Sequence, residues 1–160
     1  MADTTKKTII VFSGDFDRVM AALIIANGAA AMGDDVTMFF TFWGLNALRR
    51  PARIPTQGKS PLQRAFGMMM PRGPGKLGLS QLNFAGAGPR LMKRVMRQQN
   101  VSSLEELIDM AREQGVKMVA CTMSMDVMGL KPEELIDGLE FAGVATYLGE
   151  ADEANVNLFI

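Results

Sequence analysis

The stretch Val116-Lys-Met-Val-Ala-Cys-Thr122 joins a mostly apolar run to the single cysteine of the chain. A short apolar run of this kind is typical of a strand that is buried in a parallel sheet. Cys121 follows residues 116–120 directly. The sequence therefore places the thiol at the carboxyl end of a strand, which is the edge where open α/β sheets bind their ligands.

Strand-like runs alternate with helix-like segments on both sides of this stretch. Alternation of this kind predicts a three-layer α/β/α fold, with a mostly parallel sheet of about five strands and helices on both faces. Pro132, Glu133 and Glu134 carry the signals that open a helix. The expected strands are residues 8–12, 36–40, 116–120, 139–142 and 156–160, and the expected helices are residues 18–32, 89–99, 103–114, 144–154 and a segment that begins at Pro132.

Residues 51–89 differ from the rest of the chain. They hold six of its seven prolines and seven of its sixteen glycines, and only residues 62–70 keep a helical period. This segment has too little periodic apolar sequence to build a core of its own. We therefore expect one domain over residues 1–160 with an insertion at about 51–89, which serves as a lid or docking arm near Cys121 or as a structural filler.

The composition limits the chemistry. A chain of 160 residues suits one domain with its own core. It contains no histidine, which removes Ser-His and Cys-His nucleophile pairs and any histidine metal site. The polar start of the chain and the absence of a long apolar segment predict a soluble, cytoplasmic protein without a signal peptide.

The charges are unevenly distributed although they sum to zero. Formal charge is −2 over residues 1–35, +11 over residues 36–104 and −9 over residues 105–160. The basic stretch has three interpretations: pairing with acidic surface within or between subunits, docking of an acidic protein partner, or contact with an anionic membrane surface. Nucleic acid is not expected, because the chain lacks the aromatic stacking platforms that are typical of proteins that bind single strands.

The loops after the first two strands are expected to open on the same edge as Cys121. We therefore expect a pocket that combines Cys121 with these loops and with the turn that follows the thiol. A helix start at this turn would favour the thiolate, whereas the alternative is a buried and inert Cys121. The pocket residues are Ser13, Gly14, Asp15, Trp43, Thr122, Met123 and Ser124.

Methionines form two clusters, one in the insertion and one beside Cys121. Thioethers with a thiolate could hold Cu(I), but methionine more often fills gaps in a core, so we expect no metal and no cofactor. The clusters are Met68, Met69 and Met70, and Met123, Met125 and Met128.

The segment Cys121-Thr-Met-Ser-Met-Asp-Val-Met-Gly129, after its apolar strand, resembles the cysteine segment of the DsrE/DsrF/DsrH-like sulfur-carrier family. It is most similar to the DsrE-type subgroup found beside rhodanese-like and TusA-like proteins. The first strand with Ser13-Gly14-Asp15, the Met-rich insertion and residues 135–149 are similar too.

The resemblance implies a persulfide on Cys121 that is loaded by one sulfurtransferase and passed to another. It also implies a homo-oligomer, as a trimer or a multiple of trimers. Members are often labelled as peroxiredoxins or as NAD(FAD)-dependent dehydrogenases. The sequence supports neither label, because it has no resolving cysteine and no G-x-G-x-x-G after a strand.

Two functional classes follow. One is a sulfur carrier or sulfurtransferase that acts through Cys121. The other is a non-catalytic oligomeric binding or scaffold module in which Cys121 only packs.

Overall fold

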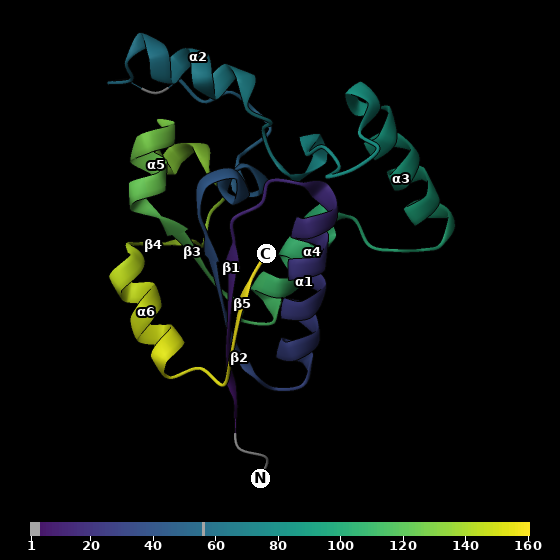
Figure 1. The fold of residues 1–160 in the computed structure, drawn as a ribbon, viewed down its shortest axis with the longest axis vertical. Coiled ribbons are helices and arrows are strands. Elements are labelled where there is room, and N and C mark those ends of the chain that lie inside the picture. Colours follow the sequence, from purple (N-terminus) through teal and green to yellow (C-terminus); the bar gives the residue numbers. More distant parts are fainter. Residues whose placement is uncertain (1–3, 56) are drawn as a thin grey trace.

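The computed structural model describes residues 4–55 and 57–160, so residue 56 of the expected insertion lies outside it. Five strands form one sheet in the order β4-β3-β2-β1-β5, and every neighbouring pair is parallel (Figure 1). This confirms the expected three-layer α/β/α fold. The strands are β1 (Lys6–Val11), β2 (Asp35–Phe40), β3 (Lys117–Cys121), β4 (Glu140–Ala142) and β5 (Val156–Phe159).

One face of the sheet carries the main core. Helices α1 (Phe16–Ala31) and α4 (Leu104–Glu113) pack against each other on this face. Small residues of α1, such as Ala22 and Ala26, are fully buried there and allow the helix to lie close to the sheet. From β3, Met118 and Ala120 point into this core.

The opposite face is covered by α6 (Val144–Asp152), which lies across the sheet from α1 and α4 (Figure 1). Side chains alternate between the faces of a strand, so Val119 and Cys121 point to this side. The core here is small, and Tyr147 is the buried residue of α6.

The carboxyl edge of the sheet is closed by short helices. The 3-10 helix η1 (Phe42–Leu48) follows β2, and α5 (Thr122–Met128) begins directly after β3. Helix α2 (Pro61–Met69) supplies the helical segment expected at residues 62–70 and begins at a Ser60/Gln63 capping box.

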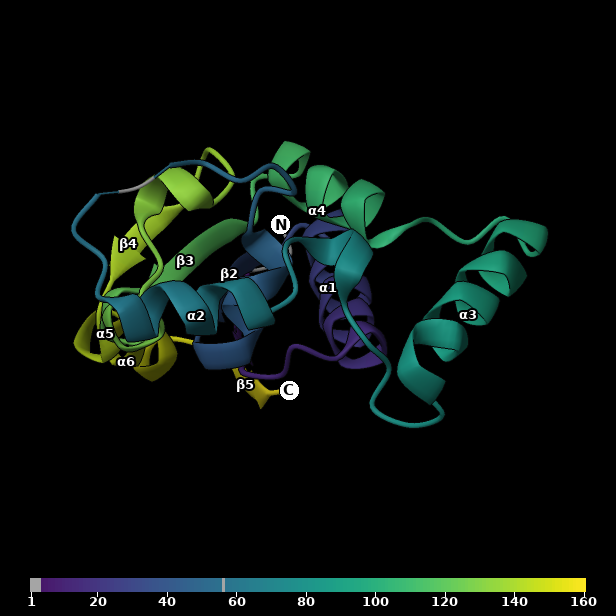
Figure 2. The same cartoon turned by 90° about the horizontal axis from the view of Figure 1, so that it is seen from above.

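The rest of the basic stretch extends away from the sheet. It contains η2 (Pro74–Lys76), η3 (Phe84–Gly86) and α3 (Ala87–Gln98). In both ribbon views α3 stands apart from the sheet and its helices (Figure 1, Figure 2). The basic amphipathic helix expected at residues 89–99 is therefore present and largely exposed.

The prediction of a helix that begins at Pro132 is wrong. The segment forms only the single turn η4 (Pro132–Glu134), although its local signals favour a helix. Leu135 is fully buried and pairs with Arg49 in an antiparallel bridge, and the next N–H, of Ile136, donates to the Leu48 carbonyl at 2.9 Å. These tertiary bonds hold the backbone extended where the helix would continue.

Candidate functional site around Cys121

Cys121 is the last residue of β3 and the N-cap of α5. Its backbone is extended, with φ −71° and ψ 114°, and its side chain makes no capping hydrogen bond to α5. The thiol is thus placed at a helix start, as the sequence predicts, but its sulfur is not held by the N–H groups of that helix.

The thiol lies under α6. Cys121 is only 3% exposed and packs with Phe39, Val119 and Tyr147. The Tyr147 ring lies 5.1 Å from the Phe39 ring, and its hydroxyl shares a 3.1 Å hydrogen bond with Thr8 Oγ1. A reagent or partner protein can therefore reach the sulfur only if this packing opens.

The covering segment lies at the edge of the sheet. We call residues 140–152, which comprise β4 and α6, the α6 cover. Strand β4 is three residues long and lies at the edge of the sheet, where Ala142 pairs with Cys121 itself. The apolar side chains of Val144 and Leu148 on α6 are exposed. Tyr147 is the one buried side chain of α6. Two polar contacts also tie α6 to the sheet: Glu150 pairs with Lys117 Nζ at 2.8 Å, and the Ala151 carbonyl accepts from Asn157 Nδ2 at 3.1 Å.

Four of the residues predicted for one pocket do lie together. Ser13, Gly14, Asp15 and Trp43 line a cavity of about 370 Å³ at the carboxyl end of β1. The Asp15 N–H donates to Ser13 Oγ at 3.0 Å. A Cβ at Gly14 would lie 2.8 Å from the Trp43 carbonyl oxygen, so the close approach of the two loops requires glycine.

The other predicted pocket residues lie elsewhere. Cys121, Thr122, Met123 and Ser124 are not among the residues that line this cavity. Thr122 and Met123 are exposed, whereas Ser124 is fully buried. Ser124 Oγ lies 2.7 Å from Thr41 Oγ1, a hydrogen bond that ties α5 to the end of β2.

Sequence reasoning missed Asn46, which lines the same cavity as Ser13 and Trp43. Its side chain is 2% exposed, and its Oδ1 atom has no hydrogen-bond partner among the described residues. A lone buried acceptor of this kind is costly unless something donates to it. The signal was present in the sequence, because Asn46 is the one strongly polar residue in the run of η1.

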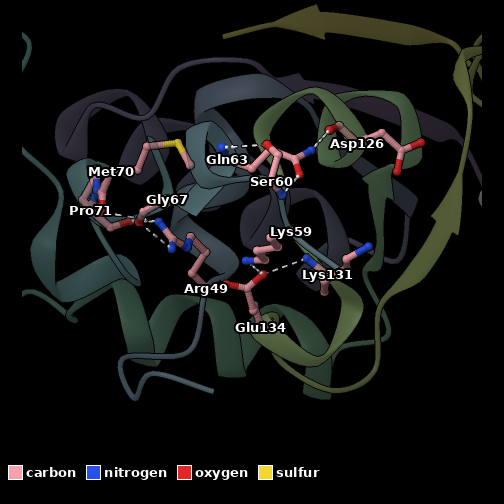
Figure 3. Close-up of polar contacts among 10 residues, drawn as sticks. All are labelled: Arg49, Lys59, Ser60, Gln63, Gly67, Met70, Pro71, Asp126, Lys131 and Glu134. Carbon is pink, nitrogen blue, oxygen red and sulfur yellow. Dashed lines mark hydrogen bonds and ion pairs between the residues drawn. The ribbon is translucent and has the colours of Figure 1, made fainter. Parts of the chain in front are cut away.

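The insertion is fastened to the core beside α5 (Figure 3). Gln63 Nε2 of α2 donates to the Asp126 carbonyl of α5 at 3.2 Å, and the Phe66 ring lies 6.0 Å from the Trp43 ring. In the described residues, no member of the cluster around the Cys121 side chain comes from residues 51–89. The insertion thus contacts the helix after the thiol, while α6 covers the thiol itself.

Arg49 anchors the far end of α2. Its fully buried guanidinium donates to the carbonyls of Gly67 and Pro71 at 3.1 Å each and of Met70 at 3.3 Å (Figure 3). These carbonyls at the end of α2 have no partner within the helix, so a side-chain donor satisfies them. In the sequence, Arg49 is only one of the bases of residues 36–104, and no local pattern indicates this role.

The methionine clusters divide between core and surface. Met70, Met125 and Met128 are buried in the main core. Met68, Met69 and Met123 are exposed. In residues 4–55 and 57–160, no three side chains of His, Cys, Asp or Glu are grouped so as to hold a metal ion.

No helix within these residues is both long enough and apolar enough to span a bilayer.

Comparisons with solved structures support the fold. The structure superposes on the YchN protein of E. coli with a TM-score of 0.56 at 13% identity, covering 98% of this chain and 100% of that one. A protein of unknown function from Methanobacterium thermoautotrophicum gives a TM-score of 0.58 at 13% identity, with 98% and 99% coverage.

Comparisons of sequence find relatives of much higher identity. An uncharacterized protein of Bacillus subtilis, YrkE, is 58% identical over the full length of both chains. The sulfur carrier protein DsrE2 of Allochromatium vinosum is 38% identical, covering 97% of this chain and 98% of that one. The family model described as the DsrE/DsrF/DrsH-like family matches residues 4–159. This chain therefore belongs to the DsrE/DsrF/DrsH-like family, as its cysteine segment predicts.

Proposed function

We propose that this protein is a sulfur carrier that holds a persulfide on Cys121 and relays it between partner proteins. The observation that carries the proposal is the position of Cys121, the only cysteine of a histidine-free chain, at the carboxyl end of a central strand. Membership of the family and the 38% identity to a protein named a sulfur carrier support a role in sulfur relay.

The chemistry requires only the thiolate and a donor that carries a sulfane sulfur. The Cys121 thiolate attacks the outer sulfur of a donor persulfide, R–S–SH. A new S–S bond forms at Sγ, the S–S bond of the donor breaks, and R–S⁻ leaves with the electron pair. Transfer to an acceptor thiolate repeats the step with Cys121 as the leaving thiolate, so no oxidant, metal or cofactor is consumed.

Burial under α6 suits a carrier better than a turnover enzyme. A persulfide packed among Phe39, Val119 and Tyr147 is protected from water and stray thiols between transfers. Loading and unloading then require the α6 cover to open. Local opening of an edge segment costs less than global unfolding.

The partners that we propose are a rhodanese-like donor and a TusA-like acceptor. Exposed basic side chains of α3, including Arg90, Arg94 and Arg97, stand on a helix that projects from the body of the protein. Such a helix suits an acidic partner, and complementary charge would speed their encounter. We place the insertion at 51–89 within a single domain, as a docking arm, and contact with an anionic membrane surface is a weaker alternative.

We also propose a homo-oligomer, as a trimer or a multiple of trimers, in the cytoplasm, where thiols stay reduced. Exposed apolar side chains on the α6 side of the sheet, such as Leu148 and Phe159, support an interface there.

One observation favours the alternative of a non-catalytic binding module. Cys121 is nearly inaccessible and its sulfur makes no hydrogen bond to α5, as expected of a packing cysteine.

Mass spectrometry of the intact protein separates the two functions. After incubation with a persulfide donor or with a thiosulfate-loaded sulfurtransferase, the wild type should gain the mass of one sulfur atom. A reductant should remove it, and Cys121→Ser should gain nothing. Equal uptake by Cys121→Ser, or no uptake by the wild type from either donor, would show that Cys121 is not a carrier.

A further inference from the structure

A pocket of about 340 Å³ beside α2 concentrates positive charge. Its lining includes the basic side chains of Arg53, Lys59, Arg64 and Arg72, and one carboxylate, that of Glu134. The basic residues come from the loop between η1 and α2, from α2 itself, and from the segment that follows it. The four basic side chains and the one carboxylate together carry a formal charge of +3.

The single carboxylate is already engaged (Figure 3). Glu134 Oε2 lies 2.5 Å from Lys59 Nζ and accepts from the Lys131 backbone N–H at 2.8 Å. Glu134 is 3% exposed, so this ion pair is largely shielded from solvent. Glu134 therefore neutralises Lys59 and leaves the three arginines of the pocket uncompensated.

These three guanidinium groups have no anionic partner in the part of the chain that the structure describes. Among residues 4–55 and 57–160, no carboxylate lies within 4 Å of Arg53, Arg64 or Arg72, and their side chains donate no hydrogen bond to the protein. Arg64 shares one face of α2 with Gln63, Gly67 and Met68, which also line the pocket. The pocket is thus lined by guanidinium groups whose N–H donors have no partner among the described residues.

A buried arginine adds to the positive field behind the pocket. Arg49 donates to Gly67, a lining residue, and its Nε atom has no hydrogen-bond partner within the described part of the chain. Burial, together with the neighbouring charge of Arg72, lowers the pKa of Arg49 to about 10. The fold therefore leaves positive charge here that the carboxylates of the described residues do not balance.

We propose that this pocket is a binding site for a small, doubly charged oxyanion, held by the guanidinium groups of Arg53, Arg64 and Arg72. A guanidinium group is planar, and its N–H donors match the spacing of the oxygens in sulfate, phosphate and thiosulfate. Charge-assisted hydrogen bonds to such anions are stronger than hydrogen bonds between neutral groups. The pocket is separate from the Cys121 cluster, so the site stands whether or not Cys121 carries sulfur.

Binding to the folded state raises thermal stability, which gives a direct test. Sodium sulfate, phosphate and thiosulfate are titrated into the full chain at constant ionic strength, with sodium chloride as the balance. The melting temperature and the heat of binding should both saturate with the divalent anions. Arg64→Gln and Arg72→Gln should each weaken binding about tenfold or more, as expected for the loss of a charge-assisted hydrogen bond.

Arg94→Gln is the matched control, because Arg94 is an exposed arginine of α3 that does not line the pocket. It should bind like the wild type. Arg53→Gln, which changes a residue in an exposed loop, provides a third variant if a change in α2 perturbs folding.

Three results would overturn the proposal. One is that the divalent anions give no saturable change in melting temperature or heat of binding beyond that of chloride. The second is an equal rise in melting temperature with the divalent anions in the wild type and in all three pocket variants. The third is binding of a polyglutamate peptide without binding of any inorganic oxyanion, which would reassign the pocket as a docking surface for an acidic protein.

Discussion

Tyr147 should control access to Cys121. Tyr147→Phe keeps the ring against Phe39 and removes only the hydrogen bond between the hydroxyl and Thr8 Oγ1. A buried hydrogen bond of this kind contributes about 1 kcal/mol. If that amount is lost from the opening free energy of the α6 cover, the open population and the alkylation rate of Cys121 rise about fivefold.

Tyr147→Ala removes the ring as well. The ring is 7% exposed and packs on Phe39, so its loss should cost about 3 kcal/mol or more, from packing and from the aromatic pair. The alkylation rate should then rise about a hundredfold. Thr146→Ala is the control, because Thr146 lies on the same helix and is an exposed polar residue. It should change the rate by less than about twofold, as expected of a surface substitution.

The assay is alkylation by iodoacetamide under native conditions, followed by intact mass, with urea unfolding of each variant in parallel. The urea data show whether global unfolding is too rare to explain the measured rates. If Tyr147→Ala leaves the rate unchanged, or if Thr146→Ala raises it equally, then reagents reach the thiol by a route that does not involve α6.

Two further predictions concern the insertion and the assembly. Arg49→Met should lower the free energy of unfolding by about 3 kcal/mol, because three carbonyls at the end of α2 lose a charged donor. In urea denaturation, Arg90→Met on α3 should stay within about 0.5 kcal/mol of the wild type, and a matching small loss for Arg49→Met would refute the anchor. The homo-oligomer should dissociate as salt is raised if basic and acidic surfaces of neighbouring subunits pair. Light scattering at low salt and micromolar concentration tests this, and a monomer there would contradict it.

Much of the fold could be read from local pattern. The central strands are apolar runs that end in polar or small residues, and the parallel sheet follows from their alternation with helices. Residues 62–70 kept a helical period inside a segment rich in proline and glycine, and α2 lies there. Cys121 at the end of β3 could also be predicted, because the run before it is short and mostly apolar.

The parts that could not be predicted depend on tertiary contacts. Strand alternation predicts that Val119 and Cys121 share a face, but the sequence does not say that α6 covers that face. The helix signals at Pro132 were overridden by the bridge between Arg49 and Leu135. Arg49 itself looks like any surface arginine until the end of α2 is placed over it.

The tight packing around Cys121 has a consequence if the thiol takes up sulfur. A second sulfur extends the side chain by a bond of about 2 Å, into a cluster that leaves Cys121 only 3% exposed. Adding bulk to a packed core costs about 1–3 kcal/mol. The neighbours best able to yield are those on the α6 cover, because β4 is a three-residue edge strand and Tyr147 is the one buried side chain of α6. Loading would therefore weaken the closed state, so that the loaded carrier opens more readily toward an acceptor than the empty one.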